Sequence, residues 1–153
     1  MKNIDFVALD QIAQDDLVSL MAHPSVRRYM PLLDDGFDCD AFVKAKQQLW
    51  EEHGYGPWAF VIDGVFAGWG GLQYENGDPD FALVMHPDYW GWGIRIFKNV
   101  RDRAFNELGL DYITALLPPD RTNSSALLRL GFVHVGEQLV DGTVFLKFRL
   151  DKQ

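Results

Sequence analysis

The sequence HPDYWGWGIRIFKNVRDRAF, residues 86–105, joins the end of a predicted strand to a predicted helix through two closely spaced glycines. Ser, Thr or Asp normally caps the start of such a helix better than glycine does. Glycine instead lets the main chain approach an anion, to which the first helical turn offers N–H groups and a partial positive charge. Gly91 and Gly93 therefore favour a phosphate-binding turn, and Arg95 and the basic residues after it could add positive charge.

The glycine pair alone does not identify the ligand. The stretch lacks the Gly-Lys-Ser/Thr of nucleoside-triphosphate loops and the third glycine of the dinucleotide fingerprint. A tight turn without any ligand is the alternative explanation.

On either side of this stretch, hydrophobic periodicity predicts groups of strands and helices. The dipeptides Asp63-Gly64, Asn76-Gly77 and Asp141-Gly142 are typical of tight hairpins. A meander that leads into a strand–helix–strand unit predicts a mixed sheet with helices on both faces. The predicted helices are 10–23, 26–30, 39–54, 91–109 and 120–131, and the predicted strands are 4–9, 57–63, 64–75, 79–86, 110–117, 132–140 and 143–150.

Composition excludes several classes of protein. The length of 153 residues is that of one domain, 1–153, and a net charge of −8 weighs against nucleic acid as a partner. There is no apolar run of the ~20 residues that span a membrane, and no signal-peptide profile. Cys39, as the one cysteine, excludes an internal disulfide framework and a thiolate metal cluster. We expect a cytoplasmic protein without a metal or a membrane partner.

Five collinear segments resemble the GNAT N-acetyltransferases. Residues 90–95 are similar to the family's acyl-CoA loop, Arg/Gln-x-x-Gly-x-Gly/Ala, in which only Gly93 matches outright. Trp90 stands at the Arg or Gln position, as is familiar in the branch that acetylates ribosomal-protein N-termini, and Arg95 stands at the small final position. The other segments are HPSVRRYM (23–30), FAGWGGL (66–72), DFALVMHP (80–87) and DRTNSSALLRLGF (120–132).

This resemblance implies the GNAT fold, an α/β arrangement with a mostly antiparallel mixed sheet of about seven strands. Its fourth and fifth strands part, and the pantetheine arm of acetyl-CoA lies between them. Main-chain groups around Val84 and Met85 would bind that arm, and Trp92 would pack on the cofactor. The acetyl-CoA site implied in full is Val84, Met85, Trp92, Gly93, Ile94, Arg95, Ile96 and Asn123.

Direct attack of an amine on the thioester needs a proton acceptor for the amine and a proton donor for the thiolate. Asp80 aligns with the acid at the start of the family's fourth strand and is the expected base, with His86 as a second candidate. A place in the hairpin turn is the structural alternative for Asp80. Many family members donate the second proton from a tyrosine, where this chain has Leu127. Asn123 occupies the serine position of the ribosomal-type branch, which leaves Ser124 as the candidate donor.

The expected function is therefore transfer of an acetyl group from acetyl-CoA to a primary amine in a ternary complex. The ribosomal-type branch suggests a protein N-terminus as acceptor, but a small amine, an amino acid or an antibiotic fits equally well, and a homodimer is an open alternative to a monomer. The rival hypothesis is an acyl-CoA-binding regulatory protein of the same fold without catalysis. Arg95, Asn123 and Leu127, each at a position where the family has another residue, motivate that rival.

Overall fold

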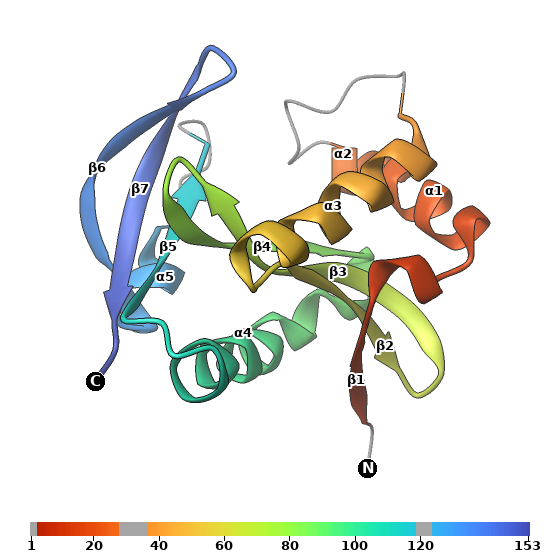
Figure 1. The fold of residues 1–153 in the computed structure, drawn as a ribbon, viewed down its shortest axis with the longest axis horizontal. Helices are drawn as coiled ribbons and strands as arrows, with labels where there is room; N and C mark the ends of the chain where they lie inside the picture. Colours follow the sequence, from red (N-terminus) through yellow and green to blue (C-terminus); the bar gives the residue numbers. More distant parts are fainter. Residues whose placement is uncertain (1–2, 28–36, 119–123) are drawn as a thin grey trace.

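The computed structural model describes residues 3–27, 37–118 and 124–153. Within these described residues, seven strands form one mixed sheet in the order β1-β2-β3-β4-β5-β7-β6 (Figure 1). Every neighbouring pair is antiparallel except β4 and β5, which run parallel, so the predicted sheet is confirmed. The strands are β1 (Ile4–Val7), β2 (Pro57–Ile62), β3 (Val65–Glu75), β4 (Asp78–Met85), β5 (Tyr112–Leu117), β6 (Val133–Val140) and β7 (Thr143–Asp151).

Helices cover both faces of the sheet. α1 (Gln14–Ala22), α2 (Pro24–Arg27) and α3 (Cys39–His53) lie on one face, and α4 (Gly93–Asp102) lies on the other (Figure 1). Each face has its own hydrophobic cluster, one built around α1 and α3 and one built around α4. The remaining helical segments are η1 (Leu9–Gln11), η2 (Pro87–Trp92), η3 (Arg103–Glu107) and α5 (Ser125–Arg129).

The hairpin turns explain why the strands could be predicted. At Asp63-Gly64, Asn76-Gly77 and Asp141-Gly142 both residues have positive φ, between 48° and 89°. This is the turn conformation whose twist matches that of the flanking strands. The helical predictions are less accurate, because 10–23 is divided into η1 and α1, and 91–109 into the end of η2, α4 and the π-helical segment η3.

The strands β4 and β5 part in the middle of the sheet, as expected. In the described part of the sheet they pair only at Asp80–Thr114 and Phe81–Ala115, whereas β4 stays paired to β3 as far as Met85. The start of β4 is tied down by Asp78, which accepts a hydrogen bond from the Tyr112 hydroxyl at 2.6 Å and another from the Lys147 ammonium. These contacts hold one end of β4 to β5 and β7, so the gap opens towards the other end.

Candidate active site

A cavity of about 780 Å³ occupies the gap between β4 and β5. Leu83 of β4 and Leu116 of β5 line it from the two sides of the gap. Ile94 of α4 lines it on one face of the sheet, and Phe42 and Lys46 of α3 line it on the other. The cavity therefore connects the two faces of the sheet, which α3 and α4 cover from opposite sides (Figure 1).

The alternation of side chains along β4 divides the cavity into two halves. Phe81, Leu83 and Met85 pack in the cluster around α4, whereas Val84 packs in the cluster around α1 and α3. Asp80 is an even number of residues from Val84, so its side chain is on the α3 side. The α4 half is thus mainly apolar, and the α3 half carries the carboxyl group.

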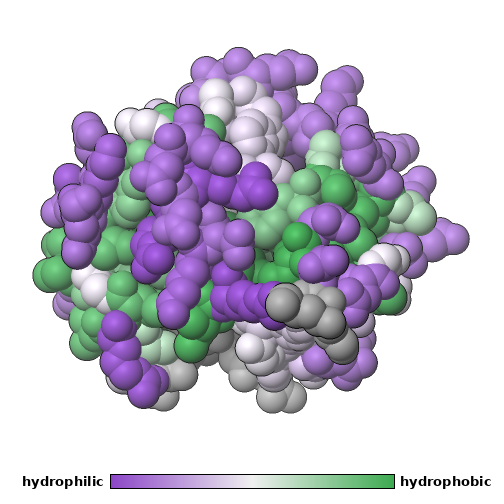
Figure 2. Space-filling view, turned by 90° about the horizontal axis from the view of Figure 1, so that it is seen from below, coloured by the Kyte–Doolittle hydropathy of each residue, from purple (hydrophilic) through white to green (hydrophobic). Residues whose placement is uncertain are grey.

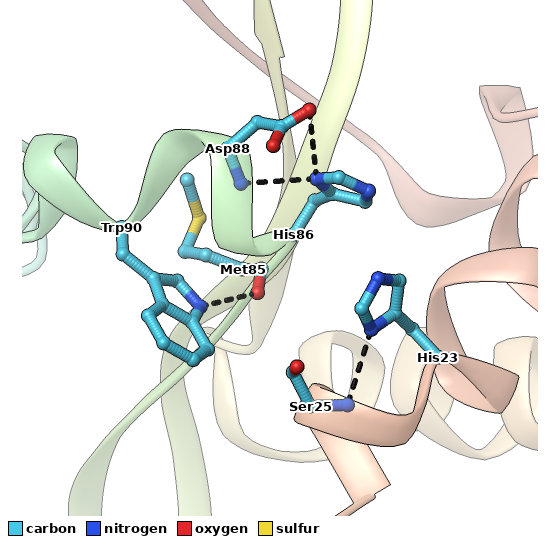
Figure 3. Close-up of polar contacts among 6 residues, drawn as sticks. All are labelled: His23, Ser25, Met85, His86, Asp88 and Trp90. Atoms are coloured by element: carbon cyan, nitrogen blue, oxygen red, sulfur yellow. Dashed lines mark hydrogen bonds and ion pairs between the residues drawn. The ribbon is translucent and has the colours of Figure 1, made fainter.

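The main-chain groups of β4 alternate in the same way. The N–H of His86 donates to the Ala67 carbonyl of β3 at 2.9 Å, so the groups of Val84, two residues earlier, also face β3. Those of Leu83 and Met85 face the gap. The main chain of Val84 therefore pairs with β3, although Val84 is among the residues that line the cavity. The Met85 carbonyl accepts the indole N–H of Trp90 at 2.9 Å (Figure 3).

Asp80 lies within strand β4 rather than in the hairpin turn, and it lines the cavity. Its side chain is 7% exposed, and its carboxylate accepts a hydrogen bond from the Thr114 hydroxyl at 2.9 Å. Burial raises the pKa of Asp80 to about 8, with smaller increases from Glu75 and Asp78, while the Thr114 hydrogen bond lowers it. A carboxyl group with such a pKa can both accept and release a proton near neutral pH.

Lys46 is a cavity residue that the sequence motifs did not indicate. Its ammonium donates to the side-chain oxygen of Gln73 and lies 5.2 Å from the ring centroids of both Phe42 and Trp69. Gln73 pairs directly with Asp80 across β3 and β4, so the lysine and the carboxyl group flank the same glutamine in one half of the cavity. Burial lowers the pKa of Lys46, and Glu75 partly opposes this shift.

The two glycines at the start of α4 have helical backbone angles and do not form a separate turn. Gly91 belongs to the 3-10 helix η2 and Gly93 has φ −55° and ψ −46°, so neither has the positive φ that requires glycine. The Gly93 N–H already donates to the Trp90 carbonyl. A Cβ at Gly91 would meet nothing within 4 Å, and at Gly93 only the Leu83 side chain at 3.5 Å. Both glycines line the cavity, so their effect is to leave space beside the first turn of α4.

The residues that follow differ in what they offer the cavity. Ile94 is 60% exposed and lines it, whereas Ile96 is fully buried in the core beneath α4. The Arg95 guanidinium lies 4.7 Å from the Trp92 ring centroid, and neither side chain is among the described lining residues. Arg95 therefore points along the helix surface. Figure 2 shows the face on the α4 side, where hydrophilic side chains surround smaller hydrophobic areas.

The His86 side chain accepts a hydrogen bond from the backbone just after β4. Its Nδ1 accepts the N–H of Asp88 at 3.1 Å, and its ring meets that of His23 edge-on at 5.0 Å (Figure 3). His23 does the same for the N–H of Ser25 at 3.1 Å. Each histidine precedes a proline that starts a short helix, and His86 is not among the described cavity-lining residues.

The short helix α5 closes the cavity with apolar groups. Ala126 and Leu127 of the helix and Leu130 just after it line the cavity, so the position of the family's tyrosine does face the cavity but carries a leucine. Ser124 precedes α5 with helical backbone angles and is not among the described lining residues. Asn123 lies outside the described residues.

The described residues contain neither a candidate metal cluster nor a candidate membrane-spanning helix. Within 3–27, 37–118 and 124–153 no group of three or more His, Cys, Asp or Glu side chains could hold a metal ion. Over the same residues, none of the helices has the length and apolar character needed to cross a membrane.

Comparison with known proteins identifies related sequences and structures. The family model for the Acetyltransferase (GNAT) domain matches residues 7–133. An acetyltransferase from Agrobacterium tumefaciens has a similar structure, with a TM-score of 0.81 at 16% identity over 97% of this chain and 91% of that one.

Two proteins from Vibrio cholerae are also similar in structure. One is provisionally named a ribosomal-protein-serine acetyltransferase, with a TM-score of 0.73 at 15% identity over 97% of this chain and 94% of that one. The other is a mutant spermidine N-acetyltransferase, with a TM-score of 0.65 at 14% identity over 98% and 93%. At these identities the structural likeness shows the fold alone.

Proposed function

The chain belongs to the GNAT acetyltransferase family, and we propose that its one domain, residues 1–153, transfers the acetyl group of acetyl-CoA directly to a primary amine. The observation that carries this proposal is the cavity, which joins the two faces of the sheet beside a buried Asp80. Acetyl-CoA would enter from the α4 side and the amine from the α3 side.

The α4 half of the cavity suits the acyl donor. The open space at Gly91 and Gly93 would admit the diphosphate to the first turn of α4, where helix N–H groups favour anions. The main-chain groups of Leu83, which face the gap, would replace missing strand pairing with hydrogen bonds to the pantetheine amides. Leu83 thus takes the part that the resemblance implies for main-chain groups around Val84 and Met85, because the Met85 carbonyl is already bonded to Trp90.

The α3 half suits the acceptor and its proton. Asp80 removes a proton from the acceptor ammonium, directly or through one water, and the neutral amine attacks the thioester carbonyl. A C–N bond forms, the C–S bond breaks and CoA leaves as a thiolate, while the second proton of the attacking nitrogen passes through water to that thiolate. Because thiols have a pKa of about 8.5, the thiolate is a tolerable leaving group near neutral pH and can take its proton from water. Ser124 remains the candidate side chain for that step.

The proposed reaction accommodates either a small amine or a protein N-terminus as acceptor, as the sequence did. The V. cholerae relatives named for ribosomal protein and for spermidine represent both kinds.

The test is release of CoA thiol from acetyl-CoA in the presence of a panel of amines and N-terminal peptides, followed with a chromogenic thiol reagent. We expect acceptor-dependent release by the wild-type protein, and a loss of at least 100-fold in Asp80→Asn with CoA affinity unchanged. Stabilisation by CoA without release for any acceptor would support the non-catalytic rival, and no stabilisation would contradict a CoA site altogether.

A further inference from the structure

Lys46 gives the acceptor half of the cavity a charge that an amine acceptor does not need. Of the described residues that line the cavity, Lys46 is the one cation, and it stands with two acids, Glu75 and Asp80. A cation beside the site repels an acceptor that carries only positive charge. Its presence therefore requires either a structural role or a negative group on the ligand.

A purely structural role leaves most of the ammonium unused. Within the described residues, Lys46 has one hydrogen-bond acceptor, Gln73, although an ammonium group has three donors. Phe42 and Trp69 present their rings to the ammonium as cation–π partners, which stabilise the charge but offer no lone pair. The burial that lowers the pKa of Lys46 also means that a bound anion would meet little competition from water.

The position of Lys46 relative to Asp80 defines the ligand further. Gln73 and Asp80 face each other across β3 and β4, and the Cα atoms of such a hydrogen-bonded pair lie about 5.5 Å apart. The side-chain oxygen of Gln73 accepts a hydrogen bond from the Lys46 ammonium. A lysine and a proton-accepting carboxyl group therefore both lie next to Gln73 on the α3 face. Their arrangement is complementary to a zwitterion, with its own ammonium near Asp80 and its own carboxylate near Lys46.

We propose that the amine acceptor also carries a carboxylate, which Lys46 binds while Asp80 takes the proton of the amine, as in a free amino acid with an apolar side chain. This inference rests on the proposed function and narrows its acceptor class. The apolar side chain would pack against Met21, Phe42 and Trp69, which line the same half of the cavity. Lys46 would repel a polyamine, and a peptide N-terminus would bring no carboxylate close enough to pair with the Lys46 ammonium.

The test compares acceptors that differ only in the carboxylate: phenylalanine, phenylalaninamide and phenethylamine, with leucine and methionine and their amides as further pairs. We expect the wild-type kcat/KM to be at least 10-fold higher for the amino acid than for its amide. Lys46→Met should lower kcat/KM about 10- to 100-fold for the amino acid, mainly through KM, and less than 3-fold for the amide. Lys46→Arg should retain most of the preference, and the exposed Lys44→Met is the matched control.

Other outcomes would overturn the inference. Equal losses for amino acid and amide in Lys46→Met would indicate a structural lysine, and a wild-type preference for the amide or a peptide would indicate an N-terminal acceptor. Thermal melting with CoA and each amino acid separates this inference from the proposed function. Stabilisation of the wild-type protein but not of Lys46→Met, without turnover, would support the carboxylate site and contradict catalysis. If the amino acids stabilise neither the wild-type protein nor Lys46→Met, the proposed carboxylate site is wrong.

Discussion

Removal of the Thr114 hydroxyl should move the pH dependence of catalysis towards alkaline pH. This hydroxyl donates to the buried Asp80 carboxylate at 2.9 Å and so favours its ionised form. A hydrogen bond to a charged group contributes about 1.5–3 kcal/mol, part of which persists in the neutral form, so Thr114→Val should raise the pKa of Asp80 by about one unit. The inflection in kcat/KM should therefore move from about 8 to about 9.

The size of the effect at fixed pH follows from the ionised fraction. With a pKa of about 8, roughly a tenth of Asp80 is ionised at pH 7, and with a pKa near 9 roughly a hundredth. The Thr114→Val protein should therefore be about tenfold slower at pH 7 and approach the wild-type rate at about pH 10. One acceptor is used throughout, so that its own titration cancels in the ratio of the two enzymes.

Thr114→Ser, which keeps the hydroxyl, is the control and should keep the inflection near its wild-type position. A loss of the same factor at every pH would indicate disturbed packing, because Thr114 is buried, and would refute the electrostatic argument. The same inflection in the residual activity of Asp80→Asn would assign the titration to another group.

Three further predictions concern stability and CoA binding. Burial raises the pKa of Asp80 from 3.8 to about 8, so the folded state loses up to roughly 5 kcal/mol relative to the unfolded chain as the pH rises between these values. The melting temperature of Asp80→Asn, minus that of the wild-type protein, should therefore increase from pH 4 to pH 8 and stay level above pH 8. A difference that does not change with pH would contradict the shift. Gly93→Asp should abolish CoA binding in calorimetry, because it puts a carboxylate at the cavity wall, whereas Gly93→Ala should fold normally, with its Cβ 3.5 Å from Leu83; full affinity in Gly93→Asp would exclude this end of α4 as the diphosphate site. Phe97→Ala, at a side chain 2% exposed between α4 and the sheet, should cost about 3–5 kcal/mol in urea denaturation, and a cost below 1 kcal/mol would mean that the core refills.

The fold could be predicted because its decisive signals are local. A dipeptide such as Asp63-Gly64 imposes its turn through its own backbone preferences, so the strands on either side follow from the sequence. Gly91 and Gly93 do not determine their own backbone conformation, because glycine adopts helical and left-handed angles almost equally well. Their helical conformation is set by η2 running directly into α4, with the Gly93 N–H bonded to the Trp90 carbonyl.

The site was only partly predictable, because its chemistry depends on pairings between distant segments. Asp80 could be aligned with a family position, but its partner Thr114 follows from the parallel register of β4 and β5. Lys46 did leave a trace in the sequence, since it stands four residues after Phe42 and three before Leu49 on the apolar side of a predicted helix. A charged residue at such a place must be exposed, paired or functional. The fold places Lys46 beside Gln73 in the lining of the cavity, so it is not simply an exposed surface charge. Gln73 is its first partner, and a bound ligand would be the second.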